Sequence, residues 1–172
     1  DEPDRPDRLI LDFDPSGERF DEVRAAARDA GDRLLDAGLV PYAMVTGSRG
    51  IHVLCPLRRA ASFTEVHAYA RTLAEQMVAD APGQLTLEWR KADRGERIYV
   101  DVNRIAYAQH AVAPYAVRPR ANAPVAVPLH WQELSQPTLA PDQWTLANLG
   151  ARLEDGDPWR GLNRRARALP RG

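Results

Sequence analysis

An apolar segment near the start of the sequence carries two carboxylates two residues apart. It reads Leu-Ile-Leu-Asp-Phe-Asp-Pro over residues 9–15, and the two acids are Asp12 and Asp14. Because the side chains of a β-strand alternate between its faces, a strand here places both carboxylates on the same face. Neighbouring anions repel each other unless a cation lies between them, and Mg²⁺ or Mn²⁺ with oxygen ligands is the usual solution. The segment therefore predicts a metal-binding strand, with a surface turn at Asp-Pro-Ser-Gly as the alternative.

The bulk properties are those of one globular domain. The 172 residues are 44% hydrophobic and 27% charged, with a formal net charge of −1, so contact with nucleic acid requires a local basic patch. One cysteine, Cys55, excludes an internal disulfide and a cysteine-rich zinc site. No apolar stretch approaches the ~20 residues that span a bilayer, and the first residues lack the pattern of a signal peptide. We expect a cytoplasmic protein with no membrane partner.

Apolar periodicity and turn residues predict the order strand, helix, hairpin, helix, strands. The predicted helices run from Phe20 to Gly38, from the capping box of Ser62 and Glu65 to Pro82, and over 142–153. The predicted strands are 9–13, 42–45, 51–54, 85–89 and 97–102, followed by an extended run at 111–118. This order predicts an α+β domain in which a mixed, mostly antiparallel sheet is backed by two helices.

A second motif is small, glycine-rich and polar. The sequence Thr-Gly-Ser-Arg-Gly at residues 46–50 joins two short strand segments, and His52 follows it. Glycines let backbone N–H groups approach an anion closely, and such turns form nests for phosphate. Arg49 can bind phosphate oxygens through two hydrogen bonds, and His52 can donate another. The motif predicts either a phosphate-binding turn or a plain hairpin turn with incidental polar residues.

A third acid, Asp101, interrupts the apolar segment 98–102. A carboxylate inside such a strand must be paired or must bind a cation, so a satisfied structural acid is the simpler interpretation. Together with the two acids of the first strand it supplies a third oxygen ligand from a different strand. Three carboxylates, a phosphate turn and two arginines, Arg94 and Arg118, are the groups that two-metal nucleotidyl transfer requires.

The order of these motifs resembles the archaeo-eukaryotic primase superfamily, and more closely the polymerase domain of bacterial DNA ligase D. The resemblance is carried by residues 6–15, 46–53, 99–101, 112–118, 128–134 and 156–159. It implies a primase-type, RRM-like catalytic core over residues 1–172. Within this single domain, residues 1–8 are expected to form a lead-in and residues 160–172, which include Arg171, a basic tail.

The resemblance also implies an activity, a site and partners. The expected activity is metal-dependent nucleotidyl transfer by a primase-polymerase of DNA end-joining repair, which adds ribo- or deoxynucleotides to a primer 3′-hydroxyl at gaps or broken ends. The implied catalytic residues and metal ligands are Asp12, Asp14 and Asp101, with Mn²⁺ or Mg²⁺ as cofactor. The implied nucleotide-binding residues are Thr46, Ser48, Arg49, His52, Arg94 and Arg118. Expected partners are NTP or dNTP and DNA ends or gapped duplex, with Ku and an ATP-dependent DNA ligase as candidates, in a nucleoid-associated protein of the bacterial cytoplasm.

Two departures from the family pattern keep an alternative open. Residues 102–105 read Val-Asn-Arg-Ile where an aromatic residue and a Gln-Asn pair are typical, and the part of the family domain before the first acidic motif is absent from the sequence. Both features favour a catalytically weak or inactive nucleic-acid-binding scaffold of primase-like fold. A phosphodiesterase could use the same acids, but the turn and the arginines suit a triphosphate better.

Overall fold

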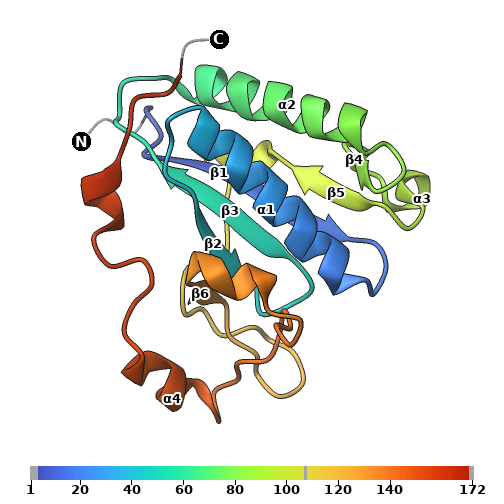
Figure 1. The fold of residues 1–172 in the computed structure, drawn as a ribbon, viewed down its shortest axis with the longest axis vertical. Coiled ribbons are helices and arrows are strands. Elements are labelled where there is room, and N and C mark those ends of the chain that lie inside the picture. The colour runs from blue at the N-terminus through green and yellow to red at the C-terminus, as the bar shows by residue number, and fades with distance from the viewer. Residues whose placement is uncertain (1–3, 107, 171–172) are drawn as a thin grey trace.

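Six strands form one sheet within residues 4–106 and 108–170, which are the residues that the computed structural model describes (Figure 1). Residues 1–3 of the predicted lead-in, and Arg171 and Gly172 of the predicted tail, lie outside the described residues. The strands are β1 (Arg8–Pro15), β2 (Tyr42–Val45), β3 (Ile51–Pro56), β4 (Leu85–Thr86), β5 (Ile98–Asp101) and β6 (Val127–Leu129). Their order across the sheet is β4-β5-β1-β3-β2-β6, and only β4 and β5 pair in parallel. The predicted α+β fold with a mixed, mostly antiparallel sheet is confirmed.

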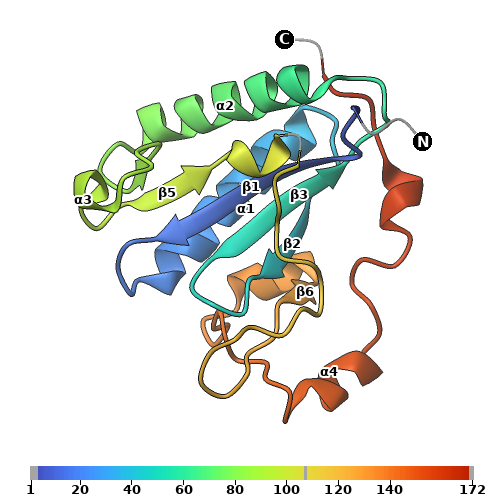
Figure 2. The same cartoon turned by 180° about the vertical axis from the view of Figure 1, so that it is seen from behind.

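Two long helices, α1 (Phe20–Asp36) and α2 (Phe63–Asp80), cover one face of this sheet, and Figure 2 shows the other face from behind. The predicted capping box starts α2: the Ser62 hydroxyl accepts a hydrogen bond from the Glu65 backbone at 3.3 Å, and the Glu65 carboxylate accepts one from the Ser62 backbone at 2.7 Å. This exchange satisfies two backbone donors that a helix start leaves unpaired. In the described part of the chain, no helix has both the length and the apolar composition needed to cross a membrane.

The alternation of side chains along β1 separates the core from the site. Leu9, Leu11 and Phe13 are fully buried in the main apolar cluster beneath the helices. Asp12 and Asp14 occupy the intervening positions and therefore point to the opposite, open face. Burying one face of the central strand in this way fixes its register, because a shift of one residue would move the acids into the core.

A smaller apolar cluster covers part of the open face near the C-terminal segment. It consists of Met44, Leu54, Ala126, Trp159 and Leu162. Beyond it, the Arg167 backbone donates to Pro56 at 3.2 Å and accepts from Arg58 at 2.8 Å. The described part of the predicted basic tail, including the 3₁₀ helix η3 (Leu162–Arg165), therefore runs back along the end of β3.

Several predicted boundaries were wrong. Only Leu85–Thr86 of the predicted strand 85–89 is a strand, because the chain then turns into the short helix α3 (Lys91–Arg94). The run 111–118 contributes only an isolated bridge between Val117 and Val125. The last helix, α4, is Leu149–Glu154 rather than 142–153.

Local structure explains why α4 starts later than predicted and why β6 was not predicted. Before α4, the Asn148 side chain accepts from the Thr145 backbone at 2.7 Å and donates to Gln143 at 2.9 Å, which fixes these residues as a turn. The strand β6 was missed because it contains Pro128, and proline normally argues against a strand. It is tolerated here because β6 lies at the edge of the sheet.

Candidate active site

The three predicted acids come together on the open face of the sheet. Asp12 lies directly opposite Asp101 in the β1–β5 ladder and directly opposite His52 in the β1–β3 ladder. Asp14 follows two residues later on β1, opposite Tyr99. Asp12 and Asp101 are each only 8% exposed, so two buried carboxylates face each other and need a cation for compensation.

In the structure, that cation is Arg104. It belongs to the 3₁₀ helix η1 (Asn103–Ile105), and its Nε lies 3.3 Å from an oxygen of Asp12 and 3.3 Å from an oxygen of Asp101. The other oxygen of Asp101 accepts hydrogen bonds from the Asn103 backbone at 2.9 Å, from the Asn103 amide at 3.0 Å and from the Tyr99 hydroxyl at 3.3 Å. Both carboxylates are therefore held in place by groups from β5 and the turn after it.

Asp14 is held by two further arginines. Its oxygens lie 3.1 Å from Nη1 of Arg94 and 3.3 Å from Nη2 of Arg49. Arg94 is itself buried: it donates to the carbonyls of Glu88 and Trp89 at 2.8 and 2.7 Å, and its guanidinium lies 4.1 Å from the ring centre of Tyr99. Arg94 thus fixes the Asp14 carboxylate to the loop that follows β4.

The predicted phosphate turn packs against both the acidic strand and the segment before β6. The Thr46 hydroxyl closes the turn, since it donates a hydrogen bond to the carbonyl of Gly50 at 3.2 Å and accepts one from the N–H of Gly50 at 3.3 Å. A Cβ on Gly50 would lie 2.4 Å from the Phe13 carbonyl oxygen, and one on Gly47, whose φ is +64°, would lie 2.7 Å from the backbone of Val125. Only glycine allows these approaches, so both glycines are required by the position of the turn beside Asp12.

One cavity of about 460 Å³ joins the acids to the turn. Its lining includes seven predicted site residues: Asp12, Asp14, Thr46, Ser48, Arg49, His52 and Arg118. The other two, Asp101 and Arg94, do not line it. Asp101 is connected to the cavity through Arg104, and Arg94 through Asp14.

Arg118 has a feature that suits an anionic ligand. Its Nε is buried and has no hydrogen-bond partner among the described residues. Its side-chain stem packs against Gly47, where an added Cβ would lie 2.9 Å from the arginine Cγ. A buried guanidinium N–H without a partner is costly, so a phosphate oxygen in this cavity would satisfy it.

Three basic residues of the cavity wall were not predicted as site residues: Arg104, His110 and Arg120. The first could have been found, because an arginine three residues after a site acid returns to it when the chain forms a helical turn. The other two come from the irregular segment between β5 and β6. In an irregular segment, no periodic pattern of polar and apolar residues indicates which side chains face the cavity.

The electrostatic surroundings keep Asp12 charged. Burial alone would raise the pKa of its carboxyl group, but the hydrogen bond and charge of His52, whose Nε2 lies 3.4 Å away, and of Arg104 outweigh burial and lower the pKa below its ordinary value. The group is therefore an anion at neutral pH, as a metal ligand must be.

The donor set suits a hard divalent cation, because it consists of carboxylate oxygens. Within residues 4–106 and 108–170, however, no group of three or more His, Cys, Asp and Glu side chains is arranged to hold a metal ion. The acids are paired with arginines: Arg104 bridges two of them, and Arg49 and Arg94 bind the third. The residues fit such a cation if the carboxylates exchange a guanidinium for it.

A sheet with two helices on one face and carboxylates beside a glycine-rich turn on the other defines a primase-type α+β core. The family model for the LigD primase-polymerase domain matches residues 1–159 of this chain. A solved polymerase domain of Mycobacterium tuberculosis ligase D, in complex with DNA, superposes with a TM-score of 0.86 and 30% sequence identity, covering 94% of this chain and 56% of that one.

Curated relatives agree with this match. The multifunctional non-homologous end joining DNA repair protein LigD of M. tuberculosis is 32% identical over 133 residues, which are 77% of this chain and 18% of that protein. The multifunctional non-homologous end joining protein LigD of Pseudomonas aeruginosa is 32% identical over 160 residues, 91% of this chain and 19% of that protein. The chain therefore belongs to the LigD primase-polymerase domain family, as its motifs predicted, and it spans about a fifth of the length of these relatives.

Proposed function

We propose that this chain catalyses metal-dependent nucleotidyl transfer, joining an incoming nucleotide to the 3′-hydroxyl of a primer. The observation that carries the proposal is the pairing of Asp12 with Asp101 across the β1–β5 ladder, beside a cavity that the 46–50 turn also lines. Membership in the LigD primase-polymerase family supports it. The arrangement places anionic ligands for a cation next to donors for phosphate, which is the pairing that phosphoryl transfer needs.

In this proposal, Asp12, Asp14 and Asp101 hold Mn²⁺ or Mg²⁺. Bound there, the cations supply the positive charge that lowers the pKa of the primer hydroxyl and stabilises the leaving pyrophosphate. Asn103 and Tyr99 keep the Asp101 carboxylate oriented through the hydrogen bonds described above. Such fixed orientation reduces the cost of arranging ligands during the reaction.

The phosphates of the nucleotide bind on the other side of the cavity. Ser48, Arg49 and His52 line it from the hairpin, and Arg118 adds its unpaired Nε from the segment before β6. Thr46 contributes by closing the turn. Arg94 reaches a phosphate only if its contact with Asp14 opens, so in the resting state its role is to position that acid.

We further propose that the substrate is a DNA end or a gapped duplex, because the solved relative is a complex with DNA and the curated relatives are end-joining proteins. NTP or dNTP supplies the added nucleotide. Ku and an ATP-dependent DNA ligase are the partners expected of a protein in that repair process.

Primer extension on a gapped duplex with a 5′-phosphate tests this function. The reaction is run with Mn²⁺ or Mg²⁺ and with ribo- or deoxynucleotides, using the wild type, Asp12→Ala and Asp101→Ala. Asp32→Ala is the matched control, since it removes an exposed acid from α1 on the opposite side of the sheet. We expect extension by the wild type and the control and its loss in both site variants, each checked for folding by circular dichroism.

A second function, a scaffold without catalysis, is favoured by one observation: each of the three acids is already neutralised by an arginine. Binding of a labelled nucleotide in the presence of Mn²⁺ separates the two. Absence of both extension and nucleotide binding in the wild type would reject the enzyme and leave the scaffold.

A further inference from the structure

Two more hollows continue from the acidic cavity along the open face. The middle hollow, about 270 Å³, shares Arg104 with the acidic cavity. The end hollow, about 370 Å³, shares Arg8 with the middle one. The three hollows follow one another from the acids toward the C-terminal segment, each sharing one arginine with the next, and we call the middle and end hollows together the arginine track.

The charges of the arginine track are strongly one-sided. The middle hollow is lined by four arginines, Arg5, Arg8, Arg59 and Arg104, against a single acid, Asp7. Arg104 also contacts the acids of the neighbouring cavity, so the other three arginines carry the excess of positive charge. The end hollow adds Arg164 and no acid. Because the whole chain has a net charge of −1, this is a local concentration of cations rather than a general property of the surface.

The one acid in the track does not neutralise it. Asp7 lies 3.5 Å from Arg59 and 4.0 Å from Arg8, and all three side chains are between 36% and 50% exposed. Exposed ion pairs at such distances contribute little. The two guanidinium groups therefore remain available to an anionic ligand.

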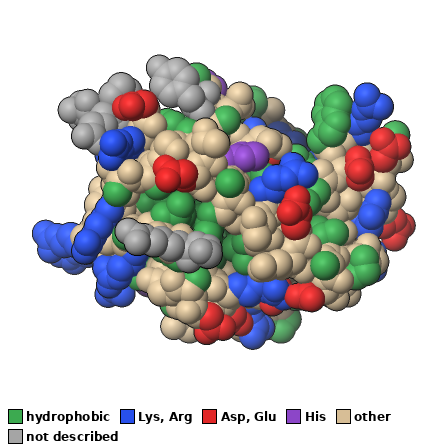
Figure 3. All heavy atoms as spheres, turned by 90° about the horizontal axis from the view of Figure 1, so that it is seen from above, with side chains coloured by type: hydrophobic (Ala, Val, Ile, Leu, Met, Phe, Trp, Pro, Cys, Tyr) green, Lys and Arg blue, Asp and Glu red, His purple; other side chains and the backbone are tan. Residues whose placement is uncertain are grey.

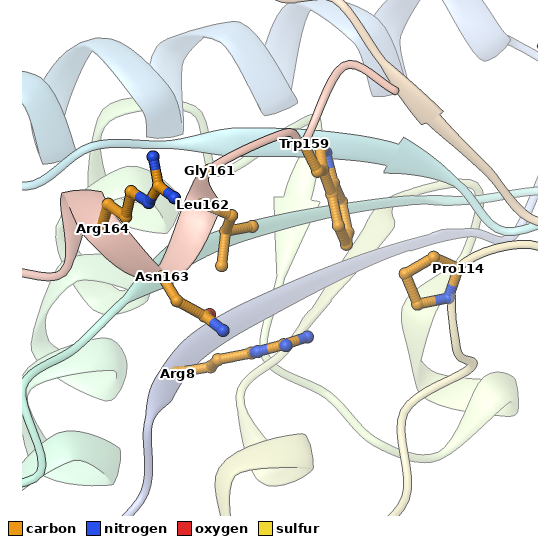
Figure 4. Close-up of a pocket in the computed structure, with 7 residues that line it drawn as sticks. All are labelled: Arg8, Pro114, Trp159, Gly161, Leu162, Asn163 and Arg164. Atoms are coloured by element: carbon orange, nitrogen blue, oxygen red, sulfur yellow. The ribbon is translucent and has the colours of Figure 1, made fainter. Parts of the chain in front are cut away.

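The end hollow also offers neutral groups that suit a nucleotide. Figure 4 shows Asn163 extending toward Arg8 on one side, with the indole of Trp159 and the ring of Pro114 on the other. The indole is fixed, because its Nε1 donates to the Ala43 carbonyl at 3.1 Å. A rigid aromatic wall beside cations and an amide is the combination by which proteins bind single-stranded nucleic acid.

We propose that the arginine track binds the single strand of nucleic acid whose 3′ end lies at the acidic cavity. The strand passes Arg104 and Arg8 and reaches Trp159 and Arg164. A polyanion matches the run of cations, and a series of small hollows suits successive nucleotides of one strand better than the broad surface of a duplex. The direction of the strand rests on the proposed function, while the binding itself does not.

Binding of a fluorescein-labelled oligothymidylate, followed by anisotropy over a range of salt concentrations, tests the proposal. The test variant is Arg8→Ala with Arg164→Ala. The matched control is Arg28→Ala with Arg71→Ala, which removes two exposed arginines from the helices on the opposite side. Removing two phosphate contacts should weaken binding about tenfold near physiological salt and lower the salt slope by about 1.4, since each contact to a single strand contributes about 0.7. The control should change neither.

Three outcomes would overturn the proposal: no binding of the oligothymidylate by the wild type, an unchanged affinity and salt slope in the test variant, or an equal loss for a blunt duplex. Mn²⁺-dependent nucleotide binding, measured on the same variants, should not change, because neither arginine lines the acidic cavity. If the wild type binds the oligothymidylate but does not extend a primer, the proposed function is rejected and the proposed binding of a single strand by the arginine track stands.

Discussion

Asp12 and Asp101 face each other across the β1–β5 ladder, and Nε of Arg104 lies 3.3 Å from an oxygen of each. A guanidinium thus occupies the position between two buried carboxylates that a divalent cation needs. The same pair of acids stabilises the fold through Arg104 and, in the proposed function, binds the metal. Resting stability and metal binding therefore compete for the same oxygens.

The first prediction concerns this competition. Arg104→Gln removes the shared cation and leaves two facing carboxylates, so without metal we expect a loss of about 1–2 kcal/mol in the free energy of unfolding, limited by the partial exposure of Arg104. Mn²⁺ should restore more stability to the variant than to the wild type. Thermal unfolding with and without MnCl₂ measures both effects. Arg71→Gln on α2 is the control, and an equal Mn²⁺ response in wild type and variant would contradict the exchange.

The second prediction concerns the close approach of the turn to the acidic strand. In Gly50→Ala the new Cβ would lie 2.4 Å from the Phe13 carbonyl oxygen and 3.6 Å from the Asp12 carboxylate. Because the nearest atom is backbone, the hairpin must move, at a cost of about 1–3 kcal/mol. Chemical denaturation should show this loss, and nucleotide affinity should fall with it. Gly17→Ala has no atom within 4 Å of the added Cβ and should change neither.

The sequence predicts those parts of the fold best whose burial leaves a periodic pattern of apolar residues. The strand Arg8–Pro15, the helices α1 and α2 and the hairpin were all predicted within a few residues, because alternating or helical burial leaves a periodic pattern. The segment between β5 and β6 was not, since its backbone is ordered by single long-range contacts. An example is the hydrogen bond from the Val125 N–H to the Trp144 carbonyl at 2.8 Å.

The site shows the same division. The three acids and the turn could be predicted because each stands in a periodic strand or a glycine-rich motif. The partners of the acids could not, since which arginine reaches which carboxylate depends on tertiary structure. Arg94, which the sequence predicts at a phosphate, contacts Asp14 in the structure, and Arg104 was not recognised as part of the site.

The third prediction concerns a buried ion pair that secures the edge of the sheet. Arg152 of α4 makes two contacts with the Glu133 carboxylate, at 2.7 and 3.0 Å, and donates to the Pro128 carbonyl in β6 at 2.8 Å. Both side chains are nearly buried. Arg152→Ala leaves Glu133 charged without its partner, so we expect a loss of about 3–5 kcal/mol.

A matched surface pair separates burial from charge. Arg33 contacts Asp80 at 2.7 Å and Asp29 at 3.0 Å, but these acids are well exposed. Arg33→Ala should cost no more than about 1 kcal/mol. Urea denaturation of both variants gives the comparison, and similar losses would show that Arg152 acts only as a surface charge.

The fourth prediction follows from the burial of Cys55 in the core behind β3. Burial raises the pKa of its thiol to about 12, above its ordinary value of 9.0. At neutral pH the thiol is protonated and inaccessible, so a thiol-specific reagent such as DTNB should react only after unfolding. The same burial makes stability depend on pH, since the pKa of the thiol is higher in the folded state than in the unfolded chain.

As the pH rises, the unfolded chain therefore loses this proton first. The stability associated with the protonated thiol is complete below about pH 9 and is lost progressively between about pH 9 and 12. Cys55→Ala should be less stable than the wild type at neutral pH because of the small cavity it leaves, and its stability should fall less steeply over this alkaline interval. Urea denaturation at several pH values measures both slopes, and parallel curves would show that the thiol does not contribute.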